Sequence, residues 1–329
     1  MSGDKQRAVV WNLWTLVAVA ITALASVTAG YYIGASGHTE NGTQVSYSID
    51  WDESGNITKL TVTDDYGRAV ALNGVPKKIV SVSPTPTEIL FAVGAGDLVV
   101  GVDEYSDYPA EAANRTKVGS FTLNIEAIVG LDPDLIVSSD LVPQQQLDQL
   151  VELGYPYFIF ATRNFEGVLK DIRMAGVLTW HIAEADALAS SLEARMNAVA
   201  QKTLALGVTK PRTYVEYYPY YTYGPGSFGD DLIRLAGGMN VGHNLTSEYP
   251  TATSEFVVAS DPQIIVYAVG PLSTTNATEI ASRPGWDTIS AVRNMQIYSI
   301  DENILSRYGP RIVDCLEQLA EILHPELFG

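Results

Sequence analysis

Two carboxylates recur at the same spacing in two similar segments of the chain. Glu126 lies six residues before Asp132, and Glu255 lies six residues before Asp261, with each Asp followed by Pro. Each segment is typical of a short helix, a proline turn and a buried strand. A Glu at a helix N-terminus can simply stabilise the helix dipole. Two such carboxylates related by an internal repeat could instead contact one basic partner at two points.

A run of tyrosines is the second candidate for binding chemistry. The segment 217–223 holds five Tyr in seven residues. Tyrosine rings combine a flat apolar face with a polar tip, which suits a large flat ligand. The alternative is that some of these rings pack in the core while others are only exposed.

The residues that usually carry catalysis or bind metal are not grouped. None of the four histidines pairs at metal-ligand spacing, which argues against a site for bare zinc or manganese. These histidines are His38, His181, His243 and His324. Ser83 and Ser227 have no visible His-Asp partners, and the loop Gly224-Pro-Gly-Ser-Phe228 lacks the Lys of a phosphate-binding loop. We therefore predict no catalytic residues, no metal site and no resident cofactor.

Composition narrows the range of partners. The net charge of −18 argues against nucleic acid, because the chain could not neutralise a run of phosphates. Cys315 is the only cysteine, so no intramolecular disulfide can form. It lies far from the N-terminus, which excludes the lipid-modified cysteine of a bacterial lipoprotein.

The N-terminal segment predicts export. Residues 8–34 are almost wholly apolar, which is long enough for a membrane-spanning helix. Lys5 and Arg7 precede this segment and no Lys or Arg follows until Lys59, so the N-terminus is expected in the cytoplasm and the rest outside. We assign residues 1–36 to an anchor or signal and residues 37–59 to a polar tether. A cleaved signal peptide ending near Ala29 is the alternative.

Five glycosylation sequons agree with an extracellular location on a glycosylating cell. Each is an Asn-x-Ser/Thr motif. They begin at Asn41, Asn56, Asn114, Asn244 and Asn276.

The rest of the chain alternates predicted strands and helices twice over. This pattern predicts two α/β lobes with parallel sheets, at residues 60–181 and 208–329. Residues 182–207 read as one helix of about 37 Å that joins the lobes as a stiff hinge. A ligand cleft is expected between the lobes, near the ends of the strands.

The order and spacing of several segments resemble the helical-backbone class of substrate-binding proteins of ABC importers, which are receptors for cobalamin, ferric siderophores and haem. The resemblance covers about residues 60–329. It rests on the segments Val75-Pro-Lys-Lys-Ile-Val-Ser-Val-Ser-Pro-Thr-Pro-Thr-Glu-Ile-Leu, Tyr105-Ser-Asp-Tyr-Pro109, Lys117-Val-Gly-Ser-Phe121, Gly224-Pro-Gly-Ser-Phe228, Leu235-Ala-Gly-Gly-Met-Asn-Val241, Arg283-Pro-Gly-Trp286, Arg307-Tyr-Gly-Pro-Arg311 and Leu323-His-Pro-Glu-Leu-Phe328.

The resemblance implies roles for particular residues. Glu126 and Glu255 match the carboxylates that meet arginines of the membrane permease. Arg307 matches an arginine at the cleft mouth, suited to an anionic ligand edge. Tyr105, Ser120, Phe121 and Tyr249 match further cleft positions of the family. Tyr217 and Tyr218 are expected ligand contacts because the tyrosine-rich run should overhang the cleft. Ser120 departs from the family, since cobalamin receptors carry tryptophan at that position.

We therefore expect a monomeric, non-enzymatic receptor anchored at the outer face of the cell membrane. It would pass a corrinoid or ferric chelate to a permease dimer driven by a cytoplasmic ATPase. A surface sensor or adhesion protein is one alternative, although it would be expected to lack the Glu126/Glu255 pair. A chelatase-like enzyme is another, although no acid/base pair is evident.

Overall fold

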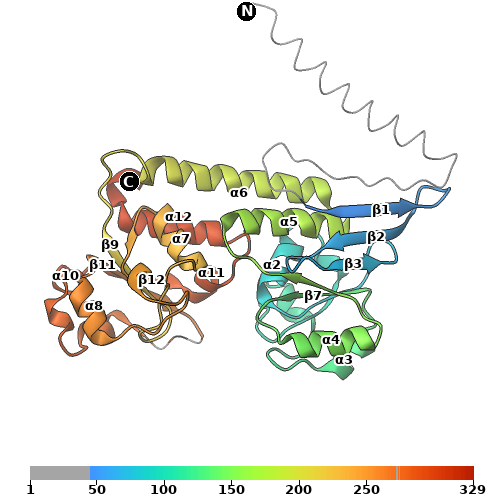
Figure 1. Cartoon of the computed structure of the whole chain (residues 1–329), viewed down its shortest axis with the longest axis horizontal. Coiled ribbons are helices and arrows are strands. Elements are labelled where there is room, and N and C mark those ends of the chain that lie inside the picture. Colours follow the sequence, from blue (N-terminus) through green and yellow to red (C-terminus); the bar gives the residue numbers. More distant parts are fainter. Residues whose placement is uncertain (1–44, 272, 274) are drawn as a thin grey trace, which may run out of the picture.

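The computed structural model describes residues 45–329 except 272 and 274, and shows two lobes side by side beneath a pair of long helices (Figure 1). The expected membrane anchor, the first part of the tether and the sequon at Asn41 lie outside the described residues. Within the described part of the chain, no helix has the length and apolar character needed to span a membrane.

The N-terminal lobe is built on a parallel sheet. Its strands are β4 (Ile79–Ser81), β5 (Val99–Val102), β6 (Thr116–Lys117), β7 (Leu135–Ser139) and β8 (Tyr157–Phe160), in the order β6-β5-β4-β7-β8. All of the pairings are parallel. Its helical segments are α2 (Pro84–Ala92), η1 (Gly96–Leu98), η2 (Ala112–Asn114), α3 (Ile125–Leu131) and α4 (Gln144–Glu152). Strand β7 is fully buried, as expected for a parallel sheet covered on both faces.

The C-terminal lobe repeats the plan with one strand fewer. Its strands are β9 (Arg212–Glu216), β10 (Met239–Asn240), β11 (Ile264–Val269) and β12 (Ile297–Asp301), in the order β10-β9-β11-β12 and all parallel. Its helical segments are α7 (Phe228–Leu235), η3 (Val241–Asn244), α8 (Ser254–Ser260), α9 (Ala277–Ala281), η4 (Trp286–Thr288), α10 (Ser290–Arg293), α11 (Glu302–Ser306), α12 (Ile312–Leu323) and α13 (Pro325–Phe328). The two-lobe fold with parallel sheets is thus as predicted.

A small antiparallel sheet precedes the first lobe and corrects one prediction. Strands β1 (Tyr47–Trp51), β2 (Ile57–Thr63) and β3 (Ala69–Leu72) pair in that order. The polar tether expected over residues 37–59 is therefore wrong for its second part. The reason is that Val45 and Ile49 are buried in the same core as Leu60 and Tyr47 packs against that core, so β1 is held as an edge strand.

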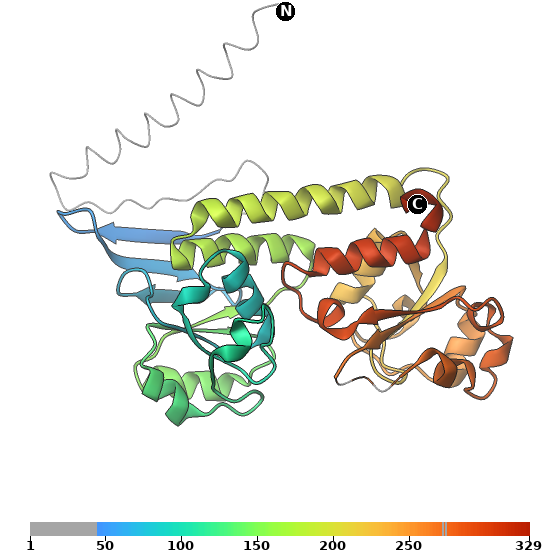
Figure 2. The same ribbon diagram turned by 180° about the vertical axis from the view of Figure 1, so that it is seen from behind.

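Two consecutive helices connect the lobes on one side (Figures 1 and 2). Helix α5 (Phe165–Thr179) ends where Trp180 takes a left-handed conformation with φ of 62°, and α6 (Ile182–Thr203) runs back along it. Helix α6 contacts α5 along one part of its length and α7 and α12 of the C-terminal lobe along another (Figure 1). One continuous core cluster accordingly includes residues of both lobes.

Candidate ligand-binding site

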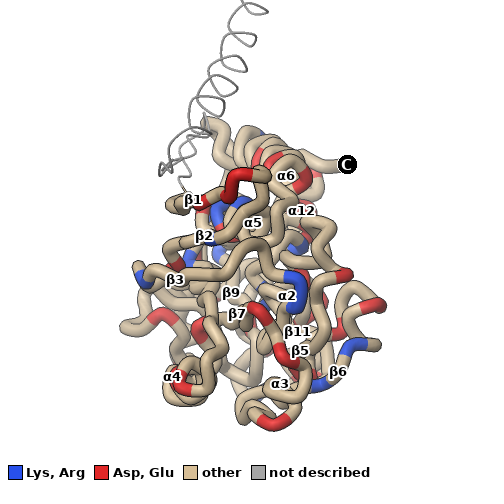
Figure 3. The backbone as a smooth tube through the Cα atoms, turned by 90° about the vertical axis from the view of Figure 1, so that its right-hand side faces the viewer, with Lys and Arg blue, Asp and Glu red and all other residues tan. Residues whose placement is uncertain are grey.

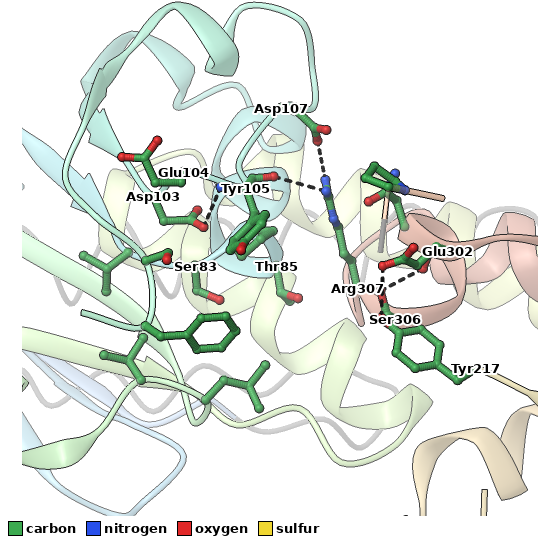
Figure 4. A pocket seen from close by; sticks show the side chains of 18 residues that line it. Ser83, Thr85, Asp103, Glu104, Tyr105, Asp107, Tyr217, Glu302, Ser306 and Arg307 are labelled. Atoms are coloured by element: carbon green, nitrogen blue, oxygen red, sulfur yellow. Dashed lines mark hydrogen bonds and ion pairs between the residues drawn. The ribbon is translucent and has the colours of Figure 1, made fainter. Parts of the chain in front are cut away.

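A cavity of about 270 Å³ lies between the lobes, at the carboxyl ends of their strands (Figure 4). In the N-terminal lobe its walls come from the loops after β4, β5, β6 and β7, and in the C-terminal lobe from the segments after β9, β11 and β12. Loops at this end of a parallel sheet are where open α/β folds bind ligands. Its lining residues are Val82, Ser83, Pro84, Thr85, Asp103, Glu104, Tyr105, Asp107, Ser120, Phe121, Leu141, Val142, Tyr217, Pro271, Glu302, Asn303, Ser306 and Arg307.

The N-terminal wall contains two exposed aromatic rings and a buried carboxylate. The rings of Tyr105 and Phe121 pack 6.1 Å apart at a tilt and remain 41% and 66% exposed, so both are available to a ligand. Asp103 is buried in the same wall, where it accepts hydrogen bonds from the Ser106 hydroxyl and the Tyr105 backbone N–H. Burial raises the pKa of Asp103 above its ordinary value. This wall can therefore offer ring faces and hydrogen-bond acceptors.

The C-terminal wall carries Tyr217 and Glu302. The Tyr217 hydroxyl lies 3.5 Å from the Glu302 carboxylate, to which it can donate, and burial raises the pKa of Tyr217 to about 12. Glu302 is itself buried and accepts a hydrogen bond from the Ser273 backbone N–H. At neutral pH the Tyr217 side of this wall therefore presents a neutral phenol.

Arg307 is the cation of the cavity, and its donors are already engaged. It donates to Glu88 at 3.1 Å, to Asp107 at 2.7 Å and to the backbone carbonyl of Tyr105 at 3.1 Å. All three acceptors belong to the N-terminal lobe, whereas Arg307 follows α11 of the C-terminal lobe. To bind an anionic ligand edge as expected, Arg307 would therefore have to give up a hydrogen bond to one of these protein acceptors.

The charge of the cavity wall is dominated by carboxylates. Asp103, Glu104, Asp107 and Glu302 line it, against the single guanidinium of Arg307. The other wall groups are hydroxyls, aromatic rings and aliphatic side chains. Such a wall favours an apolar ligand whose edge carries hydrogen-bond donors, and it repels an anionic edge.

The cavity brings together five of the seven residues expected to contact ligand, namely Tyr105, Ser120, Phe121, Tyr217 and Arg307. Tyr218 and Tyr249 are not among the lining residues. The Tyr218 ring packs edge-on against Tyr217 at 4.8 Å. The Tyr249 ring packs edge-on against that of Tyr223, and its hydroxyl lies 3.5 Å from the Tyr308 hydroxyl.

The tyrosine-rich run divides between the cavity, the core and an ion-pair cluster. Tyr223 is buried in the core. Tyr220 has a left-handed backbone and covers the guanidinium of Arg283, which lies 4.5 Å from its ring centre. Arg283 in turn forms a bidentate pair with buried Glu216 at 2.6 Å for both hydrogen bonds. Much of the run is therefore structural, because this part of the chain also builds the lobe.

Several polar residues of the cleft were not anticipated from the sequence. These are Asp103, Asp107 and Glu302 in the cavity wall, and Glu88 and Arg311 behind Arg307. One available signal was Glu88, a lone charge within the otherwise uncharged helix Pro84–Ala92. A charge on such a helix usually has a buried partner.

The two repeated carboxylates occupy equivalent positions. Glu126 is the second residue of α3 and Glu255 is the second residue of α8, and both are exposed. Each helix has seven residues, a side-chain N-cap (Asn124 or Thr253) and a left-handed Asp at its C-cap. Among the described residues, neither carboxylate forms an ion pair. Both helices lie at the ends of the lobes away from α5 and α6 (Figure 1).

Acidic positions mark the end of the N-terminal lobe that carries α3. Figure 3 shows them on α3 and α4, opposite the end of the molecule formed by α6.

The sequon residues within the described chain, Asn56, Asn114, Asn244 and Asn276, are all exposed. In the same part of the chain, no group of three or more His, Cys, Asp or Glu is arranged to hold a metal ion.

Comparisons with known proteins agree with this geometry. The model of the periplasmic binding protein family matches residues 79–304. An uncharacterised ABC transporter substrate-binding lipoprotein, YvrC of Bacillus subtilis, is 29% identical over 83% of this chain and 88% of its own length. A cobalamin-binding protein of Halobacterium salinarum is 29% identical over 80% of this chain and 74% of its own. The crystal structure of the periplasmic vitamin B12 binding protein BtuF of Vibrio cholerae superposes with a TM-score of 0.67 and 27% identity, covering 76% of this chain and 97% of that one.

Proposed function

The chain belongs to the periplasmic binding protein family, a family of binding proteins rather than enzymes, and on that premise we propose that it is the substrate-binding component of an ABC importer whose ligand is a corrinoid. The ligand would occupy the cavity between the lobes and be delivered to a permease dimer driven by a cytoplasmic ATPase. The observation that carries this proposal is the carboxylate-rich, aromatic wall of the interlobe cavity.

The chemistry of the wall favours a corrinoid over more anionic chelates. A corrin ring is flat and largely apolar, and its rim carries carboxamides that can donate hydrogen bonds. Tyr105 and Phe121 can contact the ring, while Asp103 and Glu302 can accept from the amides. Haem carries carboxylates and ferric catecholates are anions, so both would face repulsion from the same wall. Two relatives described as binding cobalamin or vitamin B12 support the choice.

A ferric siderophore of low charge, such as a hydroxamate, is the second candidate ligand. It would share the apolar contacts and avoid the repulsion. The open volume of the cavity accommodates either class only in part, so the bulk of the ligand would lie toward the mouth, where Phe121 is most exposed.

We assign the docking of the permease to Glu126 and Glu255. Support comes from their equivalent helix positions, their exposure and their placement on one side of the molecule. Exposed carboxylates can form charge-assisted hydrogen bonds with arginines of a partner. Two contact points related by the internal repeat would suit a permease built from two like subunits.

The same proposal places the globular part outside the cell, held by the N-terminal apolar segment. The relative from Bacillus subtilis is described as a lipoprotein. This chain has its only cysteine at Cys315, which is buried, so it would be anchored through the peptide segment rather than a lipid.

Calorimetric titration of the full-length protein tests the ligand class. The ligands are cyanocobalamin, cobinamide, a ferric hydroxamate, a ferric catecholate and haemin. We expect tight binding of the corrinoids and much weaker binding of haemin and the catecholate. Binding of haemin in preference to cyanocobalamin would contradict the ligand assignment. Binding of none of the five would favour a sensor or adhesion role.

A further inference from the structure

A buried ion bridge joins the two lobes behind the cavity. Glu88 on α2 of the N-terminal lobe accepts from Arg307 at 3.1 Å. Its two carboxylate oxygens also accept from Arg311 at 2.9 and 2.6 Å. Both arginines belong to the segment between α11 and α12 of the C-terminal lobe. Their side chains therefore cross the lobe boundary to reach one carboxylate.

The packing around this bridge is close. Glu88 is 3% exposed and Arg307 is 8% exposed. The Arg311 guanidinium lies 3.8 Å from the ring centre of Tyr108, in the N-terminal lobe. Between the two arginines, Gly309 lies against the N-terminal lobe, where a Cβ would be in ordinary van der Waals contact with the Thr85 carbonyl oxygen at 3.6 Å. The bridge is thus a packed contact rather than a pair of loose surface ion pairs.

Separating the lobes would break the three charge-assisted hydrogen bonds that Glu88 accepts from the two arginines. A carboxylate removed from water needs its charged partners, and removing one partner from a buried pair is strongly unfavourable. The helices α5 and α6 form a connection on one side only, about which two lobes could pivot. The Glu88 bridge supplies a second attachment at a different place, which restrains that pivot.

We propose that Glu88 is a positioning residue that sets the spacing of the two lobes, acting through Arg307 and Arg311. Glu88 does not line the cavity, so it influences ligand only through this spacing and through Arg307. By holding the lobes, it also fixes the separation of Glu126 and Glu255. This last consequence rests on the proposed function, whereas the spacing itself does not.

The spacing can be measured without any ligand. Spin labels at Gln145→Cys on α4 and Asp287→Cys on η4 report the distance between the lobes, since both positions are exposed. Cys315 is fully buried and burial raises its thiol pKa, so it should not label in the folded protein. Pulsed electron spin resonance on the full-length protein then gives a distance distribution for each variant.

We expect Glu88→Gln to broaden this distribution and extend it to longer distances. The matched control, Asp231→Asn, removes the carboxylate of an exposed ion pair within one lobe and should leave the distribution unchanged. Arg311→Gln should act in the same direction as Glu88→Gln, and the double variant should be no broader than Glu88→Gln alone. Arg311→Gln also serves if Glu88→Gln fails to fold, because Arg311 is less buried.

A folded Glu88→Gln or Arg311→Gln variant with the wild-type distribution would overturn the proposal. A merely structural role would lower the melting temperature without moving the distance. Failure of cyanocobalamin to bind in the calorimetric titration would count against the proposed function alone, since the distance measurement involves neither ligand nor permease.

Discussion

The Arg307 guanidinium of the C-terminal lobe lies 2.7 Å from the Asp107 carboxylate of the N-terminal lobe, at the wall of the cavity. Asp107 is exposed, with 56% of its side chain open to solvent, whereas the Arg307 side chain is 9% exposed. The Asp107 carboxylate is therefore accessible to ligand, while the Arg307 guanidinium is held on its buried side by Glu88.

Replacing Asp107 should change which ligands the cavity accepts. In Asp107→Asn, Arg307 loses one charged partner and the wall loses one negative charge, so anionic chelates should bind more tightly. We expect the affinity for haemin to rise by about 1 kcal/mol, the scale of a partly exposed charge interaction. Titration with haemin and cyanocobalamin measures both ligands. Glu53→Gln, an exposed residue of the β1–β2 hairpin, is the charge-matched control. A fall in haemin affinity would contradict the electrostatic account of the wall.

The exposed aromatic pair should anchor the ligand. Tyr105→Ala and Phe121→Ala should each weaken corrinoid binding by about 1–3 kcal/mol, because each removes ring contact with a flat ligand. Tyr66→Ala is the matched control, since Tyr66 is similarly exposed but lies in the β2–β3 turn. Unchanged affinity in both cavity variants, measured by calorimetry, would remove the ring-contact assignment.

Substitutions that prevent docking to the permease should leave ligand binding unchanged. The double substitution Glu126→Arg with Glu255→Arg should abolish uptake and leave ligand affinity intact, because both residues lie away from the cavity lining. Glu184→Arg with Glu321→Arg makes the same charge change on exposed positions of α6 and α12 and should keep uptake. Uptake of labelled cyanocobalamin by cells that carry each variant is the measurement. Retained uptake in the first variant would show that the permease binds elsewhere.

The buried pair of Arg283 and Glu216 should dominate the stability of the C-terminal lobe. Arg283→Met would leave the Glu216 carboxylate, which has no exposed side-chain surface, without its bidentate partner. Breaking such a pair costs about 3–5 kcal/mol of unfolding free energy. Urea denaturation of this variant beside Arg293→Met, an exposed arginine, measures the difference. A loss no larger than that of Arg293→Met would contradict this role.

The raised pKa of Asp171 leads us to predict that the stability of the fold falls as pH rises. Burial, followed by the nearby Asp65 carboxylate, raises the pKa of Asp171 well above its ordinary value of 3.8. An acid with a raised pKa in the folded state stabilises the fold below the unfolded pKa, and this contribution is lost as pH rises through the folded pKa. Asp171→Asn should therefore flatten the decline in melting temperature above pH 4 and leave the acidic side little changed. A decline as steep as that of the wild type would contradict it.

The amino-acid pattern was sufficient to predict the two-lobe architecture of the molecule. Alternating apolar strands and capped helices predicted two parallel-sheet lobes, because this periodicity is local and each lobe repeats it. The same locality explains why Glu126 and Glu255 could be paired from their spacing to Asp132 and Asp261. Strand β1 was missed because it lies in a mostly polar segment, and its contacts with the core through Ile49 and Tyr47 follow only from the fold.

Which charged groups meet in the cleft depends on contacts between residues that are far apart in the sequence. From the sequence, the resemblance to the receptor family identified Tyr105, Ser120, Phe121 and Arg307 as candidates, and the tyrosine-rich run after a predicted strand identified Tyr217. Only the tertiary structure decided that Arg307 meets Glu88 and Asp107, 219 and 200 residues away along the chain. The charge available to a ligand depends on which buried groups neutralise one another, and that follows from how the lobes pack rather than from local sequence.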